Sequence, residues 1–398
     1  MKKVAIALSF AISSSFALSL DEIVDTALKN NQNLKSIQSS INVADENINL
    51  SRKWMNPTLT LGVNDIHFDE PFKRDQEAMQ AQYIGFSQVI PVGNKLDIKE
   101  EISQKNKTIA ALQLEDTKLI LKSKIYEISY NILILERKLE LLKKYEQNIK
   151  KIEKLSQGLY SLGKSSQNEI LSAKIAYSNV QIQKQNLKNM IDNLYLKLEQ
   201  ISYKKIDTID ASLEVGKLVL NMDIQNHPKI KIQEEKIGKF NELSKLELEK
   251  QKGDIKVNVA YFNRDSKFKD YANISVNIPL SIYKTEKVKA LKQKIKAKEE
   301  RNRLEDIKQN FKIELMSLEN NINSAYKNYS MIHETIIPLK QKMQKNLESY
   351  NSFSSIKPQM IIQNLNELIS YELKSYEQLE KYYSNYSKSK YYRYKALK

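Results

Sequence analysis

The sequence predicts a mainly α-helical protein with a small β part, built from one structural unit that occurs twice in tandem. Each copy has the order helix, short alternating strand, loop, short alternating strand, very long helix, tight turn and long helix. Three observations predict this architecture. Short motifs recur at a nearly constant spacing, helix-breaking residues are scarce, and each half contains two short segments in which apolar and polar residues alternate.

The spacing of matching motifs shows the duplication. Residues 88–92 are echoed by residues 276–280, so that Pro91 recurs as Pro279 at an offset of 188, and Tyr160 recurs as Tyr350 at an offset of 190. A period of this length indicates a duplicated structural module rather than a short-repeat solenoid.

Scarce helix breakers predict unusually long helices. The 398 residues include only 8 glycines and 7 prolines, well below the usual share of roughly 12%. Residues 94–157 contain neither, and a helix of that length would extend about 95 Å. Such a helix needs partners lying alongside it, and apolar pairs seven residues apart, such as Ile102 and Ile109, are typical of that packing.

The same signals divide the chain into segments. The predicted order is a signal peptide at residues 1–17, a first repeat at 18–201 with strands near 58–66 and 82–90 and a helical hairpin near 94–201, a connector at 202–226, and a second repeat at 227–398 with strands near 255–263 and 271–279 and a hairpin near 285–391. Residues 20–53 are expected to form one helix that ends before Pro57. Pro338 predicts a kink inside the second long helix.

The N-terminal segment predicts export. Lys2 and Lys3 precede an apolar run, and small residues lead to Ala17, which is the pattern of a secretory signal peptide. The chain has no cysteine, which excludes disulfides, thiolate metal sites and a lipid-bearing N-terminal cysteine. We therefore expect no lipid anchor of that kind. The net charge of +16 falls to +14 without the two signal-peptide lysines, and the cations are interleaved with acidic and amide side chains, which favours a solvated helical surface over a nucleic-acid site.

Strict alternation in the second repeat predicts strands with one apolar and one polar face. Val257 and Val259 alternate with Lys256 and Asn258. The following strand has Ile274 and Val276 on one face and Asn273, Ser275 and Asn277 on the other. A transmembrane β-barrel requires this pattern because one face meets lipid and the other meets water, although a half-buried soluble hairpin has it too. Four strands cannot enclose a water-filled barrel, whereas a trimer would supply twelve.

In these features the chain resembles the TolC family of outer-membrane efflux proteins, over nearly the whole of the mature sequence. The resemblance depends on the order of several motifs, which are residues 19–23 followed by 27–31, Pro57 before the first strand, residues 88–93 after the second strand, Tyr160 with Gly163, and Ile170, Leu171 and Ala173. It implies a homotrimer with a twelve-stranded β-barrel in the outer membrane, continued by a long periplasmic α-helical barrel. It also implies a periplasmic adaptor and an inner-membrane pump as partners.

The resemblance also implies roles for particular residues. Contacts with the adaptor are expected at the two hairpin tips, namely at Gly163, Lys164, Ser165, Ser166, Ser354, Ser355 and Pro358. Many family members carry a glycine at the second tip, where this chain has Phe353, and an acidic residue six positions later, where this chain has Gln359. Glu169 occupies that offset in the first repeat, and Glu367 is the acid nearest to the second tip. Glu169, Gln359 and Glu367 are therefore the candidates for an entrance constriction. A polar barrel lumen is expected to contain Lys256, Asn258, Asn273, Ser275 and Asn277.

Other functional classes have weaker support in the sequence. No catalytic triad, phosphate loop or dinucleotide motif occurs in a suitable context, so we expect no enzyme activity and no cofactor. His67, His227 and His333 are far apart and none has a partner at metal-ligand spacing, so no metal site is expected. Two alternatives stay open, a soluble periplasmic coiled-coil or adaptor protein and an exit duct for secreted polypeptides.

Overall fold

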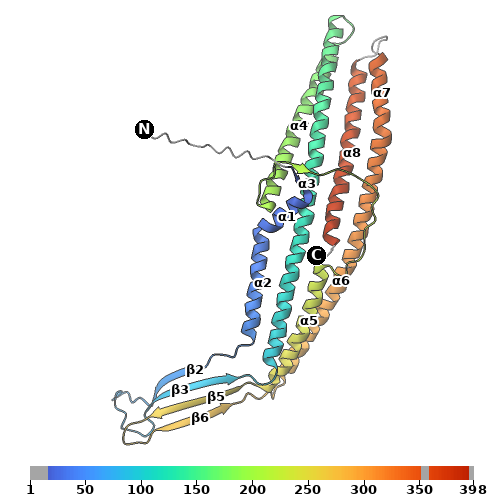
Figure 1. Ribbon diagram of the computed structural model, residues 1–398. Coiled ribbons are helices and arrows are strands. Elements are labelled where there is room, and N and C mark those ends of the chain that lie inside the picture. The colour runs from blue at the N-terminus through green and yellow to red at the C-terminus, as the bar shows by residue number, and fades with distance from the viewer. Residues whose placement is uncertain (1–16, 351–357, 394–398) are drawn as a thin grey trace, which may run out of the picture. The chain divides into compact units, whose positions relative to one another are not determined.

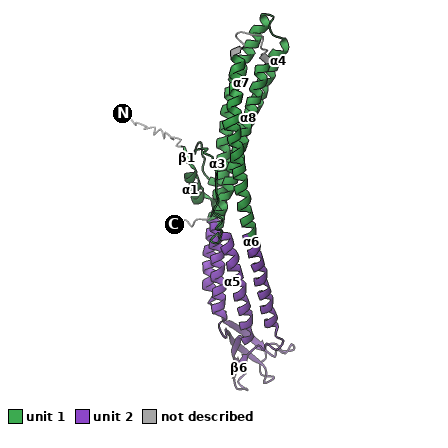
Figure 2. Cartoon of the chain, turned by 90° about the vertical axis from the view of Figure 1, so that its right-hand side faces the viewer, with its two compact units in different colours: residues 1–34, 116–227, 309–398 green, residues 35–115, 228–308 purple. Residues whose placement is uncertain are grey.

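The computed structural model describes residues 17–350 and 358–393. The predicted signal peptide lies outside the described residues except for Ala17, and Ser354 and Ser355 of the second predicted tip lie outside them too. The chain forms two compact units (Figure 2). Unit 1 contains residues 1–34, 116–227 and 309–398, and unit 2 contains residues 35–115 and 228–308. Each unit combines parts of both sequence repeats, because the long helices belong partly to one unit and partly to the other.

The elements follow the order that the repeats predict (Figure 1). In the first half they are β1 (Leu18–Ser19), α1 (Leu20–Asn30), α2 (Gln32–Ser51), β2 (Thr58–Asn64), β3 (Ala81–Ile90), α3 (Lys95–Ser161) and α4 (Gln167–Ser202). The second half contains β4 (Ile209–Asp210), α5 (Pro228–Glu249), η1 (Lys250–Lys252), β5 (Ile255–Asn263), β6 (Tyr271–Asn277), α6 (Thr285–Ser330), η2 (Met331–Ile336), α7 (Ile337–Tyr350) and α8 (Pro358–Tyr392). Strands β2 and β6 both end two residues earlier than expected.

Unit 1 is a bundle of two helical hairpins. One hairpin is the part of α3 from Asp116 onward with α4, and the other is the part of α6 from Gln309 onward, continued by η2 and α7, with α8 (Figure 1). Apolar side chains from both hairpins form one core, which contains Leu142, Tyr145, Ile149, Ile152, Ala173, Ala176, Val180, Ile337, Ile361, Ile362, Leu365, Leu368 and Ile369. The narrow apolar seams of the sequence are thus buried against each other, while the charged faces stay in solvent.

The N-terminal helix differs from the sequence prediction. Residues 20–53 were expected to form one helix, but the helix breaks at Asn31, whose backbone is extended. The Asn31 side chain accepts hydrogen bonds from the backbone N–H groups of Asn33 and Leu34, at 3.0 and 3.2 Å, and thereby caps α2. It also donates a 3.1 Å bond to the carbonyl of Ile201 in α4. These capping and tertiary bonds stabilise the break.

The connector contains a strand that the sequence did not predict. Ile209 and Asp210 pair in parallel with Leu18 and Ser19, near the start of the described residues. Two-residue strands leave no alternation to detect, so only the tertiary pairing defines them.

The second long helix contains a wider helical turn before Pro338, where the sequence predicted a kink. Residues Met331–Ile336 form a π-helix between α6 and α7. Proline has no N–H to donate to the carbonyl of Glu334, and its ring clashes with that carbonyl, so a widened turn accommodates the residue. The helix is therefore irregular next to Pro338, as predicted. The irregular segment is a π-helix of six residues on the N-terminal side of the proline.

Unit 2 contains most of α2, the start of α3, α5 with η1, the start of α6 and a four-stranded sheet. Its helices are joined by polar contacts, including the Lys105 to Glu235 ion pair at 3.2 Å and the Ser244 hydroxyl donating to the Ala290 carbonyl at 2.9 Å. At the junction with the sheet, Asp254 accepts a 3.2 Å bond from the Val92 N–H and pairs with the buried ammonium group of Lys95. This junction connects the end of β3 to the start of β5.

Replacing Asp254 with Asn is expected to lower stability in a pH-dependent way. Burial raises the pKa of Asp254, but the bonds from Lys95 and from the Val92 N–H outweigh it, so the pKa lies below its ordinary value. The ionised form therefore stabilises the fold above the unfolded-state pKa of about 3.9 and loses this effect as the pH falls through the lower folded-state pKa. Because the Asp254 side chain is 42% exposed, we expect a loss of about 1–2 kcal/mol at pH 7.

Thermal unfolding of Asp254→Asn and the wild type between pH 7 and pH 2 measures this effect. The two melting curves should converge at the acidic end. Asp192→Asn, an exposed carboxylate on α4, is the matched control and should melt like the wild type throughout. A difference at pH 7 that persists undiminished in acid would contradict the assignment.

Candidate membrane sheet and helical tip

The sheet of unit 2 has the strand order β2-β3-β5-β6, and all neighbouring strands are antiparallel. Strands β3 and β5 come from different sequence repeats and pair over nine residues. The sequence predicted both strand pairs but not this pairing between the repeats. Within the sheet, β2 and β6 are the edges, and no strand among residues 17–350 and 358–393 pairs with the outer side of either one.

One face of this sheet is apolar. Partners in register lie on the same face, and the row Leu59, Phe86, Val259 and Ile274 crosses all four strands. The next row on that face contains Leu61, Ile84 and Tyr261. The side chains of both rows are largely exposed, with Ile274 at 74% and Leu61 at 71%. A continuous apolar surface of this kind requires an apolar environment or a partner.

Away from the loops, the opposite face is mostly polar. The row Thr58, Ser87, Asn258 and Ser275 also crosses all four strands, and the Asn258 amide donates to the Ser275 hydroxyl at 3.1 Å. All five residues predicted to face a lumen lie on this face, because Lys256 pairs with Asn277, Asn258 with Ser275, and Ala260 with Asn273. The first repeat adds Thr58, Thr60 and Ser87, which the sequence analysis missed although Thr58–Asn64 alternates.

A row of aromatic rings crosses the polar face beside the loops. The Tyr83 ring stacks on Phe262 at 5.1 Å between centroids, and Phe262 stacks on Tyr271 at 4.7 Å. The row begins at Gly62, where a Cβ atom would lie 2.5 Å from the Tyr83 ring. Glycine at this position therefore lets the Tyr83 ring cover the backbone of β2, and the rings connect all four strands.

The loop between β2 and β3 contradicts one sequence expectation. His67 was expected to have no partner for a metal site, but its Nε2 atom lies 3.9 Å from a carboxylate oxygen of Asp65 and 3.9 Å from one of Glu77. The three side chains meet because the loop folds back on itself. Glu77, which is ten residues after His67 in the sequence, thereby lies next to it. Spacing along the sequence gives no signal for such an encounter.

The first hairpin tip is a well-defined turn in unit 1. Gly163 adopts a left-handed backbone with φ of 68°. Its N–H donates to the Tyr160 carbonyl at 2.9 Å, and the N–H of Lys164 donates to the Leu159 carbonyl at 2.8 Å. This pair of bonds is a Schellman motif, which satisfies the free carbonyls at the end of α3. Lys164, Ser165 and Ser166 then lead into α4, so the four predicted contact residues of this tip are consecutive in the turn.

The predicted entrance acids have different surroundings. Glu169 is only 7% exposed and accepts a hydrogen bond from the Ser165 hydroxyl in the first turn of α4. A carboxylate there is also favoured by the positive end of the helix dipole. Glu367 pairs with Lys340 of α7, and hydrogen bonding to that lysine lowers the pKa of Glu367. Gln359 and Pro358 belong to the first turn of α8. Whether these residues form a constriction remains a prediction.

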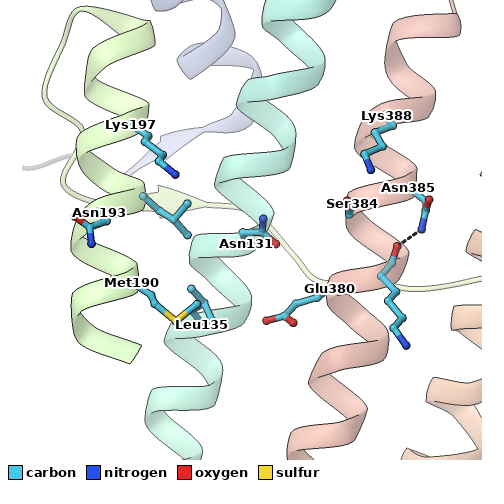
Figure 3. Close-up of a pocket in the computed structure, with 11 residues that line it drawn as sticks. Asn131, Leu135, Met190, Asn193, Lys197, Glu380, Ser384, Asn385 and Lys388 are labelled. Carbon is cyan, nitrogen blue, oxygen red and sulfur yellow. Dashed lines mark hydrogen bonds between the residues drawn. The ribbon is translucent and has the colours of Figure 1, made fainter. Parts of the chain in front are cut away.

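A groove of about 660 Å³ lies in unit 1 between α3, α4 and α8 (Figure 3). Leu135 of α3 and Met190 of α4 form an apolar part, while Lys197, Glu380 and Lys388 are charged. Glu380 is paired with Lys138 of α3 at 2.6 Å. The groove is thus lined by apolar, amide and charged side chains from three helices.

A comparison with protein families matches the first half of the chain. The model of the outer membrane efflux protein family matches residues 23–202. The resemblance to TolC-family proteins that the sequence motifs indicated is therefore confirmed. A search of curated protein sequences found no match.

Solved structures with a similar fold include outer membrane channels. The CmeC outer membrane channel of Campylobacter jejuni is 14% identical, with a TM-score of 0.73 over 98% of this chain and 93% of that one. The open state of the MtrE outer membrane channel of Neisseria gonorrhoeae is 12% identical, with a TM-score of 0.76 over 94% and 88%. The outer membrane protein VceC of Vibrio cholerae is 10% identical, with a TM-score of 0.68 over 91% and 94%. These similarities confirm the predicted fold class.

Among residues 17–350 and 358–393, no helix has both the length and the apolar composition needed to cross a bilayer.

Proposed function

We propose that this protein is the outer-membrane exit channel of a tripartite efflux system, and that three copies close a single twelve-stranded barrel. The observation that carries this proposal is the sheet of unit 2, which has an exposed apolar face and a polar opposite face. Lipid would cover the row that contains Leu59 and Ile274, and water would fill the side with Asn258 and Ser275.

The open edges of the sheet support a shared barrel. In lipid, unpaired backbone N–H and C=O groups each cost several kcal/mol, so β2 and β6 need strand partners there. Because the strands alternate in direction from β2 to β6, β6 of one copy can pair antiparallel with β2 of the next. Three copies would provide twelve strands, enough for a barrel with a water-filled interior.

The helical hairpins would then form the periplasmic part of the channel and contact an adaptor at their tips. The rigid turn at Gly163 and the exposed side chains around it, including Leu162 at 69% exposure, suit a protein contact. The channel would have no energy source and no enzyme activity of its own. It would passively conduct substrates that the adaptor and an inner-membrane pump deliver.

Membrane fractionation combined with complementation tests this proposal. We expect the protein to remain in outer membranes after washing with high salt and with carbonate, and to restore drug resistance to cells that lack their own exit channel but retain the cognate adaptor and pump. Release into the soluble periplasmic fraction would refute the channel and favour the coiled-coil alternative. Retention in the membrane with restored polypeptide secretion and no restored resistance would favour the secretion duct.

A further inference from the structure

The loop between β2 and β3 brings together three side chains that can donate to a metal ion. One ligand atom each of Asp65, His67 and Glu77 lie within 4.8 Å of one another. The imidazole Nε2 atom is 3.9 Å from each of the nearest carboxylate oxygens, which is longer than a hydrogen bond. The three groups thus converge on a common space without being hydrogen-bonded to one another through these atoms.

We propose that Asp65, His67 and Glu77 form a binding site for a divalent transition-metal ion, of the class of Zn²⁺. Ligand atoms about 2.0–2.2 Å from zinc lie about 3.4 Å apart in a tetrahedral site, so each 3.9 Å separation needs to shorten by only about half an ångström. A set of one imidazole and two carboxylates suits zinc and its neighbours better than magnesium or calcium, which prefer oxygen ligands alone. Water would complete the coordination.

The surrounding loop already holds the ligands in place. The buried side chain of Gln80, 2% exposed, accepts from the Gln76 N–H at 3.1 Å and donates to the Lys73 carbonyl at 3.1 Å. These bonds fix the turn that carries Glu77. Asp65 sits directly after β2 with φ of 58°. A largely preformed site loses less conformational entropy when it binds an ion.

The loop is also attached to the neighbouring loop between β5 and β6. The Arg264 guanidinium donates to the Ala78 carbonyl at 2.9 Å, and Lys267 pairs with Asp75 at 2.9 Å. A metal ion would connect Asp65 and His67 at the start of the β2–β3 loop to Glu77 near its end. The ion would therefore join the two ends of the β2–β3 loop, and this loop is already bonded to the β5–β6 loop. If the proposed function holds, these loops border one mouth of the barrel, but the binding site itself does not depend on that function.

Zinc binding by the purified mature protein in detergent, without a polyhistidine tag, tests the proposal. Isothermal titration with ZnCl₂ is compared for the wild type, His67→Ala, Glu77→Gln and the matched control Asp69→Asn, which removes an acid of the same loop outside the cluster. We expect one high-affinity zinc ion per wild-type chain, an affinity reduced about tenfold or more in His67→Ala and Glu77→Gln, and no change in Asp69→Asn. Equal binding by the wild type and His67→Ala, or no saturable binding by the wild type, would overturn the proposal.

Limited proteolysis provides a readout of loop closure. Trypsin cleavage after Lys73 and Arg74, followed by mass spectrometry, should slow at least threefold on adding zinc to the wild type and stay constant for His67→Ala. Circular dichroism of both proteins verifies that the variant is folded. Zinc protection of His67→Ala equal to that of the wild type would also overturn the proposal, since the ion would then act elsewhere.

Discussion

Lysine in place of Ile274 is expected to prevent stable insertion into the outer membrane. Ile274 is 74% exposed near the middle of β6, on the apolar face beside Val259. A lysine on the lipid face near the bilayer midplane costs about 2–4 kcal/mol, and each trimer would carry three. The amount of protein in carbonate-washed outer membranes should therefore fall at least about tenfold, since every 1.4 kcal/mol corresponds to a factor of ten.

The adjacent residue provides the matched control. Asn273 lies on the opposite face, in register with Ala260, where a lysine would point into water. Asn273→Lys carries the same added charge in the same strand and should accumulate to within about twofold of the wild type, because lumen substitutions change selectivity rather than stability. Similar amounts of both variants in the membrane would contradict the prediction that one face of the sheet contacts lipid and the other contacts water.

Proline in place of Gly163 is expected to abolish the function of the first tip. Proline fixes φ near −65°, whereas Gly163 has φ of 68° and donates its N–H to Tyr160. The substitution removes this bond and is incompatible with the turn, at a cost of about 3 kcal/mol or more. If the tip contacts the adaptor, cells expressing Gly163→Pro should become sensitive to the substrates of the pump while membrane insertion is retained.

A second substitution at the same position separates the effect of disrupting the turn from the effect of merely replacing the glycine. Asparagine adopts the left-handed conformation more readily than most residues, and a Cβ atom at Gly163 would meet no atom of the described residues within 4 Å. Gly163→Asn should therefore retain most of the resistance. Minimum inhibitory concentrations are measured alongside the amount of each variant in the membrane. Unchanged resistance with normal amounts of Gly163→Pro would contradict the assignment of the tip as a functional contact.

The sequence predicted those features that leave a local pattern. The mainly helical fold class with a small β part is confirmed, and alternation in residues 255–263 and 271–277 separated an apolar from a polar face. The helical tip at Gly163 coincides with one of few glycines in the chain. In each case the relevant interactions are between residues close in sequence, so periodicity or a breaker residue marks them.

Features that depend on distant residues were missed. The pairing of β3 with β5 joins the two repeats, and the β1–β4 pair joins residues 18 and 19 to the connector. His67 meets Glu77 only after the loop folds back. The partner of Glu367 was also unforeseen, since Lys340 lies on another helix. Alternation identifies a strand and its faces, but it does not specify which strand becomes its neighbour.

The mass of the detergent-solubilised particle tests the central claim most directly. If the sheet of unit 2 contributes four strands to a shared barrel, analytical ultracentrifugation corrected for bound detergent should give three chains of 46.3 kDa each, less the signal peptide. The particle should aggregate when the detergent is removed, because the face containing Ile274 would then be exposed to water. A single chain that remains monodisperse in buffer without detergent would contradict the account.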